Sequence, residues 1–161
     1  MASLSASSCR DAPEGRNESA GEVADALAEV RIEPGLWEVT SAVVDVRAPN
    51  LPIAVRRRMI GPRPGLRNCV TPAQAARPDA NFLAGQSRRG CAYRDFSMEN
   101  GRLRGTMTCP DVAMTMDGRY GPQAFELRMA MESAMPDGAT MRLDIRTGGR
   151  RIGPCETGGS G

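Results

Sequence analysis

Apolar residues recur at every second position along most of the C-terminal half of the chain, a pattern typical of strands with one buried face. Two such runs flank Asn100-Gly101, a dipeptide typical of two-residue hairpin turns. With this turn Met98 lies opposite Leu103, and the apolar residues of both runs share one face. A three-residue loop pairs Met98 with Arg102 instead and separates the apolar residues. The pattern therefore predicts a β-hairpin closed by a two-residue turn.

Three further alternating runs follow the hairpin, and residues typical of turns precede each of them. The sequence therefore predicts a five-stranded antiparallel meander. The residues that share a face in these three runs are Val112, Met114, Met116, Gly118 and Tyr120; Phe125, Leu127, Met129 and Met131; and Ala139, Met141, Leu143 and Ile145.

The N-terminal half adds two short helices and two strands to this meander. Helical spacing predicts a helix over residues 22–30, and an N-cap threonine followed by proline predicts another over 71–76. Alternation predicts strands over 36–46 and 53–60, the second of which resumes over 66–70. The predicted fold is mainly β: a curved antiparallel sheet or partly open barrel of about seven strands, with one or two short helices and two disulfides.

Residues 1–20 are polar, small and charged, and predict a disordered leader or a lipoprotein tether before a single β-rich domain over 21–156. Residues 157–161 are predicted to be a flexible tail. Small residues precede Cys9, as they precede the lipidated cysteine of bacterial lipoproteins, but the basic and apolar regions of a signal peptide are not found before it. Lipidation of Cys9 and an ordinary tail cysteine both remain open.

The hairpin register bears on which cysteines can pair. It places Cys91 opposite Pro110 and Cys109 opposite Ala92, so the two sulfur atoms project from opposite faces. The predicted disulfides are therefore Cys69 with Cys91 and Cys109 with Cys155. A pairing of Cys69 with Cys109 stays open, because four cysteines allow three connectivities.

The composition excludes several kinds of chemistry. The chain has no histidine and no lysine, so all 21 basic residues are arginine. Ser-His and Cys-His nucleophile pairs, Schiff-base chemistry and a P-loop lysine are therefore excluded. The acidic residues at alternating strand positions are predicted to face solvent and arginines on neighbouring strands; they are Glu38, Asp95, Asp117, Glu126 and Asp144. The sequence predicts no enzyme, no catalytic residue, no cofactor and no metal.

Charge is unevenly distributed along the chain. Residues 51–110 contain 11 arginines and 3 acidic residues, and the densest points are Arg56-Arg57-Arg58 and Arg88-Arg89. These clusters suit an anionic partner such as a lipid headgroup or a polysaccharide, although a solvated strand face also explains them. Nucleic acid is not expected, because no aromatic residues are interleaved for base stacking. The residues predicted for ligand or partner contact are Trp37, Arg56 and Arg58, with Trp37 also suited to a core or rim position.

Two methionine pairs offer a second kind of chemistry. Met114 with Met116, and Met129 with Met131, lie on single faces of predicted strands, a spacing that soft Cu(I) sites can use. The same residues complete apolar faces, which favours core packing. The four cysteines, if reduced, would suit a zinc site, but they lack the paired Cys-x-x-Cys spacing.

Several short motifs occur together along the chain: Pro34-Gly35-Leu36-Trp37-Glu38-Val39-Thr40, Cys69-Val70-Thr71-Pro72, the Cys91 and Cys109 spacing, Gly118-Arg119-Tyr120, and Gly149-Arg150-Arg151-Ile152-Gly153-Pro154-Cys155. In this combination the chain resembles a family of exported bacterial proteins, domain of unknown function 3617, over about residues 32–155. The resemblance implies a secreted, periplasmic or lipid-anchored protein with four matching cysteines. It implies no activity and no catalytic residue.

Together these observations predict an exported, non-enzymatic binding or envelope-interaction module, periplasmic or anchored to the outer membrane, and monomeric. Its expected partner is a small apolar ligand, a lipid or an anionic envelope component, with the ligand held on the sheet. The alternative is a soft-metal or redox protein that uses the methionine pairs or a labile disulfide.

Overall fold

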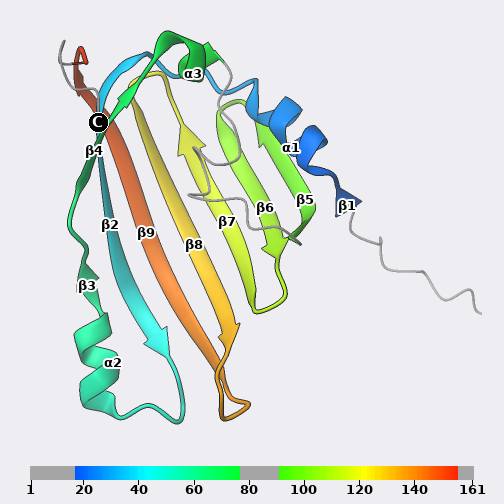
Figure 1. Cartoon of the computed structure of the whole chain (residues 1–161), viewed down its shortest axis with the longest axis vertical. Coiled ribbons are helices and arrows are strands. Elements are labelled where there is room, and N and C mark those ends of the chain that lie inside the picture. Colours follow the sequence, from blue (N-terminus) through cyan, green and yellow to red (C-terminus); the bar gives the residue numbers. More distant parts are fainter. Residues whose placement is uncertain (1–16, 77–90, 156–161) are drawn as a thin grey trace, which may run out of the picture.

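The fold is a curved antiparallel sheet with short helices at its ends (Figure 1). The computed structural model describes residues 17–76 and 91–155, so Cys9, Arg88-Arg89 and the predicted tail lie outside the described residues. The helices are α1 (Ala20–Leu27), α2 (Ile53–Met59) and α3 (Pro72–Ala76). The strands are β1 (Asn17–Glu18), β2 (Gly35–Arg47), β3 (Gly61–Pro62), β4 (Leu66–Val70), β5 (Ala92–Glu99), β6 (Arg102–Thr108), β7 (Val112–Tyr120), β8 (Ala124–Ala134) and β9 (Thr140–Gly153).

Strand order confirms the predicted meander. Strands β5 to β9 are neighbours in sequence order, β2 pairs with β9, and β3 and β4 both pair with β2. Seven of the described strands have five residues or more, which agrees with the predicted mainly β fold. Strand β1 adds to the free edge of β5, so residues 17 and 18, which the sequence placed in the leader, belong to the sheet.

The β5–β6 hairpin confirms the predicted turn. Met98 pairs with Leu103, and the two turn residues Asn100 and Gly101 have φ angles of 51° and 73°. Positive φ at both central positions is the type I′ geometry that suits the right-handed twist of the strands. A Cβ at Gly101 would lie 2.5 Å from the Tyr120 carbonyl oxygen, so glycine is needed here for space as well.

The predicted cysteine pairing is wrong, because a β-bulge changes the register along this hairpin. Ser97 pairs with Arg104, but Arg94 pairs with Thr106, so β5 carries one extra residue between these two points. One extra residue moves every later side chain to the other face. Cys91 therefore comes opposite Cys109, and the observed disulfides are Cys91–Cys109 and Cys69–Cys155, with Cα–Cα distances of 4.1 and 5.4 Å.

The bulge is stabilised by a contact that is distant in sequence. Asp95, in the bulge, has a φ of 50°, and the neighbouring Phe96 backbone N–H donates a hydrogen bond of 2.8 Å to the Glu18 carboxylate. Glu18 belongs to β1 and lies 78 residues earlier in the chain. Nothing in the alternation of the hairpin itself indicates this bulge.

The strand predicted over residues 53–60 is also wrong, because these residues form α2. The Pro52 carbonyl oxygen accepts hydrogen bonds from the backbone N–H groups of Val55 and Arg56, which starts the helix. The edge of β2 that this strand would have joined is occupied by β3 and β4. A β-branched pattern indicates a strand only where a neighbouring strand is available to pair with it.

The predicted cap of α3 is confirmed, whereas α1 begins at a cap that was not predicted. Ser19 and Glu22 form a reciprocal capping box at α1, in which the Ser19 backbone N–H donates to the Glu22 carboxylate at 2.7 Å. The helix begins at Ala20, two residues before the predicted start. Thr71 and Gln74 exchange equivalent hydrogen bonds at α3.

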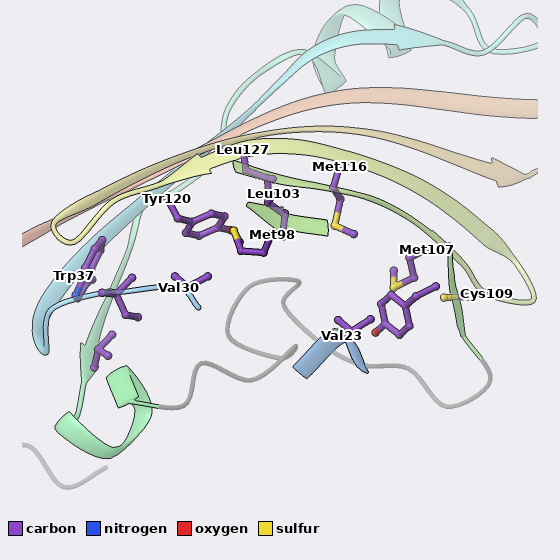
Figure 2. Packing of buried hydrophobic residues seen from close by; sticks show 13 residues of the cluster. Val23, Val30, Trp37, Met98, Leu103, Met107, Cys109, Met116, Tyr120 and Leu127 are labelled. Carbon is purple, nitrogen blue, oxygen red and sulfur yellow. The ribbon is translucent and has the colours of Figure 1, made fainter. Parts of the chain in front are cut away.

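One face of the sheet, here called the inner face, carries the main hydrophobic core. The strands curve over it, and side chains from α1, α3 and the segment before β2 pack against it (Figure 2). Its buried residues are Val23, Val30, Ile32, Trp37, Val70, Tyr93, Met98, Leu103, Met107, Cys109, Met116, Tyr120 and Leu127. A smaller buried cluster, which includes Val43, Val46 and Leu143, lies towards the other end of β2 and packs against Met59 of α2.

A row of aromatic rings crosses the inner face. Phe125 stacks with Tyr120 at a centroid distance of 5.1 Å and lies 6.2 Å from Trp37. Gly149, on the strand between β8 and β2, faces the Phe125 ring, and a Cβ there would overlap the ring. The glycine thus leaves the space in which the ring crosses β9.

Candidate functional site

The opposite face of the sheet, here called the outer face, carries the charged residues of the strands. Glu38 accepts from Arg150 at 2.9 Å and from Arg67 at 3.4 Å, while Asp117 pairs with Arg102 at 2.9 Å and with Arg104 at 3.2 Å. These contacts confirm for Glu38 and Asp117 that the carboxylate faces arginines on neighbouring strands. Both carboxylates are used in ion pairs.

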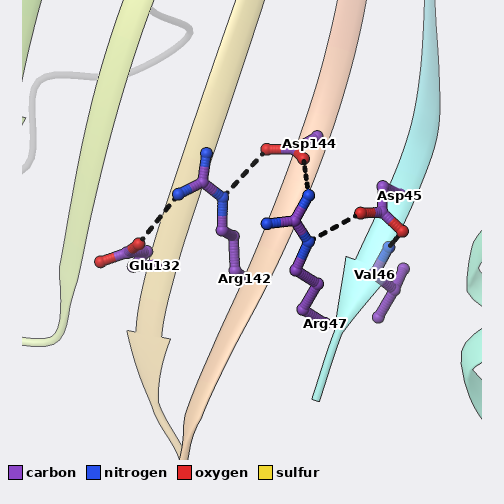
Figure 3. A network of polar contacts seen from close by, with 6 residues as sticks. All are labelled: Asp45, Val46, Arg47, Glu132, Arg142 and Asp144. Atoms are coloured by element: carbon purple, nitrogen blue, oxygen red, sulfur yellow. Dashed lines mark hydrogen bonds and ion pairs between the residues drawn. The ribbon is translucent and has the colours of Figure 1, made fainter.

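A chain of ion pairs continues across the lower part of the outer face (Figure 3). Arg142 joins Glu132 at 3.4 Å to Asp144 at 3.2 Å, and Arg47 joins Asp45 at 2.9 Å to Asp144 at 3.9 Å. Each arginine therefore lies between two carboxylates. Two arginines against three carboxylates leave this network with a net charge of −1, so it does not favour an anionic ligand.

The ion pairs have a measurable electrostatic signature. Hydrogen bonds from Arg150 and Arg67 lower the pKa of Glu38, and a hydrogen bond from Arg102 lowers the pKa of Asp117. Both carboxylates are thus held in the charged form, which is the form that cannot act as a general acid.

Near the middle of the outer face, Arg128 and Arg146 lie beside each other and, like Arg119, form no ion pair with a described residue. Arg128 and Arg146 are direct cross-strand partners on β8 and β9. Asp117 is the cross-strand partner of Arg128 on the other side, but its carboxylate is held by Arg102 and Arg104. The side chains of Arg128 and Arg146 form no ion pair or hydrogen bond with any residue in the described ranges. Like charges directly opposite one another are unfavourable in a sheet. Asp117 and Asp144 line the smaller hollow with these arginines, but their carboxylates form ion pairs with other arginines.

These two arginines line the two adjoining hollows of the outer face. The larger, open hollow has a volume of about 610 Å³ and contains Arg102, Arg119, Arg128 and Arg146 with Asp117 and Glu126. The smaller hollow, about 350 Å³, shares Asp117, Arg128 and Arg146 with it. Four arginines against two carboxylates leave the larger hollow with a net charge of +2.

The predicted contact residues do not gather at this site. Trp37 is only 1% exposed, and its indole Nε1–H donates to the Glu33 carbonyl oxygen at 2.9 Å, so its ring belongs to the core. Arg56 and Arg58 lie on α2, beside the outer edge of β2. The arginines of the hollow were not selected from the sequence. The sequence could have indicated this pair, because a hairpin register centred on Asp137 in the β8–β9 turn places Arg128 opposite Arg146.

The methionine pairs face each other across two strands. Met114 pairs with Met131 and Met116 with Met129, so four thioethers occupy neighbouring positions on the inner face. Met114, Met116 and Met129 also belong to the main core, as predicted. Within the described chain, no group of three or more His, Cys, Asp or Glu side chains is placed to hold a metal ion. None of the described helices has the length and apolar character needed to cross a membrane.

The fold and site together define a class: a curved antiparallel sheet with two disulfides, an apolar inner face and an arginine-lined outer face. A family model for DUF3617, a protein of unknown function, matches residues 32–155. The chain therefore belongs to the DUF3617 family, as its motifs indicated. No curated protein and no solved structure shows significant similarity to it.

Proposed function

We propose that this protein is an exported, non-enzymatic binding module whose outer face holds an acidic group of an envelope component. The observation that carries the proposal is the Arg128–Arg146 pair, which lies at the junction of two hollows without a described acidic partner. Arginine forks bind carboxylate, phosphate and sulfate groups with two parallel hydrogen bonds. An anionic ligand would supply the negative charge that these two side chains lack.

The two disulfides support the proposed location. Four of the five cysteines are paired, and disulfides persist in oxidising compartments such as the periplasm or the cell surface. An anionic envelope component is available as a partner there. The proposed compartment is therefore the periplasm or the outer membrane surface.

The proposed ligand binds the polar outer face of the sheet and not the apolar inner face. The sequence favoured a small apolar ligand or lipid on the sheet, but side chains of α1 and α3 and the segment before β2 pack on the described inner face. The larger hollow, of about 610 Å³, carries six charged side chains of the outer face, whereas the smaller one combines two arginines and two aspartates with apolar residues. These features favour a charged ligand over an apolar one.

Retention on immobilised dextran sulfate, eluted with increasing salt, tests this function. The Arg128→Gln/Arg146→Gln variant should elute at clearly lower salt than the wild type, because two charges of the hollow are lost. The matched control is Arg57→Gln/Arg58→Gln, which removes the same charge from α2 and should elute close to the wild type. Equal shifts in both variants, or no retention of the wild type, would contradict the proposal.

A second candidate is binding of Cu(I) by thioether sulfurs, which the facing pairs Met114–Met131 and Met116–Met129 favour. Anaerobic titration against a competing Cu(I) chelator tests it. Submicromolar binding that is lost in Met114→Leu/Met131→Leu would support it, whereas binding weaker than micromolar would remove it. A role for a labile disulfide has no comparable observation behind it.

A further inference from the structure

The helix α2 and the chain that follows it differ from the rest of the surface. Residues 53–66, here called the edge segment, run through α2 and β3 to the start of β4 along the outer edge of β2 (Figure 1). No residue of α2 is buried, although Met59 is half-buried against the smaller core cluster. The helix is thus attached on one side and open to solvent on the others.

Exposed apolar side chains are concentrated in this segment. Six large hydrophobic side chains are exposed in the described chain, and four of them lie in the edge segment. Their exposed fractions are 57% for Ile53, 41% for Val55, 44% for Ile60 and 70% for Leu66. A concentration of this kind indicates a contact surface, because exposed apolar residues are otherwise scattered singly.

The same segment carries four arginines and no acidic residue, in a chain whose overall net charge is only +2. Arg63 donates to the Met59 carbonyl oxygen at 2.8 Å and so closes the end of α2. Arg57 and Arg58 are exposed and form no ion pair with a described residue, unlike most arginines of the outer face. Basic residues in the last turn of a helix interact favourably with the helix dipole. This interaction would explain the arginines of α2, but it does not explain the exposed apolar side chains beside them.

We infer that the edge segment docks on an anionic lipid bilayer, with Arg57 and Arg58 at the headgroups and Ile53 and Val55 at the acyl boundary. Basic and apolar side chains on one short helix are the combination that holds peripheral proteins at a bilayer surface. The positive charge of the segment is complementary to anionic lipid. Its exposed apolar side chains can also contact acyl chains, which an acidic polymer in water does not offer. The arginines of this surface lie on α2 and those of the Arg128–Arg146 pair on β8 and β9, although Pro62 of the edge segment also lines the larger hollow.

Sedimentation with lipid vesicles tests the inference. The wild type should sediment with vesicles that contain phosphatidylglycerol and stay in solution with phosphatidylcholine alone. The Arg57→Gln/Arg58→Gln variant should lose about 30-fold in partitioning, which corresponds to about fivefold per arginine. The control Arg31→Gln/Arg94→Gln removes the same charge from exposed positions outside both the edge segment and the hollows, and should partition like the wild type.

Apolar insertion is tested separately. Ile53→Ser/Val55→Ser should weaken partitioning although the charge is unchanged, and thermal unfolding of each variant checks that it is folded. Ile53→Trp should show a blue-shifted emission with anionic vesicles, because the native Trp37 is already buried and contributes a constant background.

Three results would overturn the inference: no sedimentation of the wild type, equal losses in both arginine variants, or full partitioning of Ile53→Ser/Val55→Ser. If the vesicle experiment fails, the dextran sulfate result is unaffected, because the two experiments test different sets of arginines. A loss of dextran sulfate retention only in the α2 variant would contradict the proposed function but not the docking of α2 on a bilayer.

Discussion

The two faces of the sheet are built from the same strands but are held together by different forces. On β8, Leu127 is 3% exposed within the main core, while Arg128, the next residue, lines a hollow on the outer face. The inner face is stabilised by burial of apolar side chains, and the outer face by ion pairs open to solvent. Substitutions on the inner face should therefore change stability, whereas substitutions on the outer face should mainly change binding.

The largest expected loss comes from the inner face. Leu103→Ala should lower the free energy of unfolding by about 2 to 5 kcal/mol, because it removes a side chain that is only 1% exposed and leaves a cavity. Leu66→Ala makes the same substitution at a side chain that is 70% exposed and should change stability by less than about 0.5 kcal/mol. Urea unfolding followed by circular dichroism measures both. Similar losses would mean that the inner face is not the main source of stability.

The next effect tests the aromatic row. Gly149→Ala should cost about 1 to 3 kcal/mol, because the new Cβ would overlap the Phe125 ring. Gly153→Ala lies on the same strand with no atom within 4 Å of the new Cβ, and neither glycine has a positive φ, so this control should be close to neutral. The difference in urea midpoint between the two variants measures the cost of crowding the ring. No difference would mean that the row of rings can shift without loss.

A smaller effect, of opposite sign, is expected at Tyr120. Its hydroxyl is buried and has no hydrogen-bond partner in residues 17–76 and 91–155, so Tyr120→Phe should be neutral or should stabilise the fold by up to about 1 kcal/mol. Burial also raises the pKa of Tyr120 above its usual value of 10.0. The folded state then keeps a proton that the unfolded state loses, so stability from this group is full below pH 10 and decreases above it. Unfolding measured on both sides of pH 10 should show a weaker alkaline loss in the variant.

The smallest effect is expected on the outer face. Asp117→Asn removes the carboxylate that Arg102 and Arg104 share, but these side chains are exposed and the change in stability should be slight. Because the pKa of Asp117 is lowered from 3.8, its contribution is present above that pH and is lost as the pH falls further. Unfolding measured at neutral and acid pH should show less acid destabilisation in Asp117→Asn than in Glu126→Gln, which removes a carboxylate without a described ion pair. A large loss of stability in Asp117→Asn at neutral pH would mean that the outer face, like the inner face, contributes strongly to the stability of the fold.

Local patterns were enough to predict most of the fold. The turn at Asn100-Gly101, the alternation in β7 to β9 and the cap at Thr71 all act within a few residues of sequence. The predicted elements failed where a local pattern fits two structures. Residues 53–60 alternate like a strand, yet the place beside β2 is taken by β3 and β4, and the chain forms α2 instead.

The candidate site was less predictable than the fold. That Arg128 and Arg146 lie on the polar face follows from alternation, but their meeting depends on the register across the β8–β9 turn. The absence of a described acidic partner depends further on Asp117 turning to β6. Neither feature can be obtained from one strand alone.

The sequence by itself determined the five-stranded meander, the apolar face and the turn at Asn100-Gly101, because a period of two residues and turn chemistry are local properties of the chain. Only the tertiary structure decided which cysteines pair. Pairing depends on the count of residues along both strands, and the bulge beside Asp95, held by Glu18 from β1, changes that count by one. The same dependence on strand register brings Arg128 and Arg146 together.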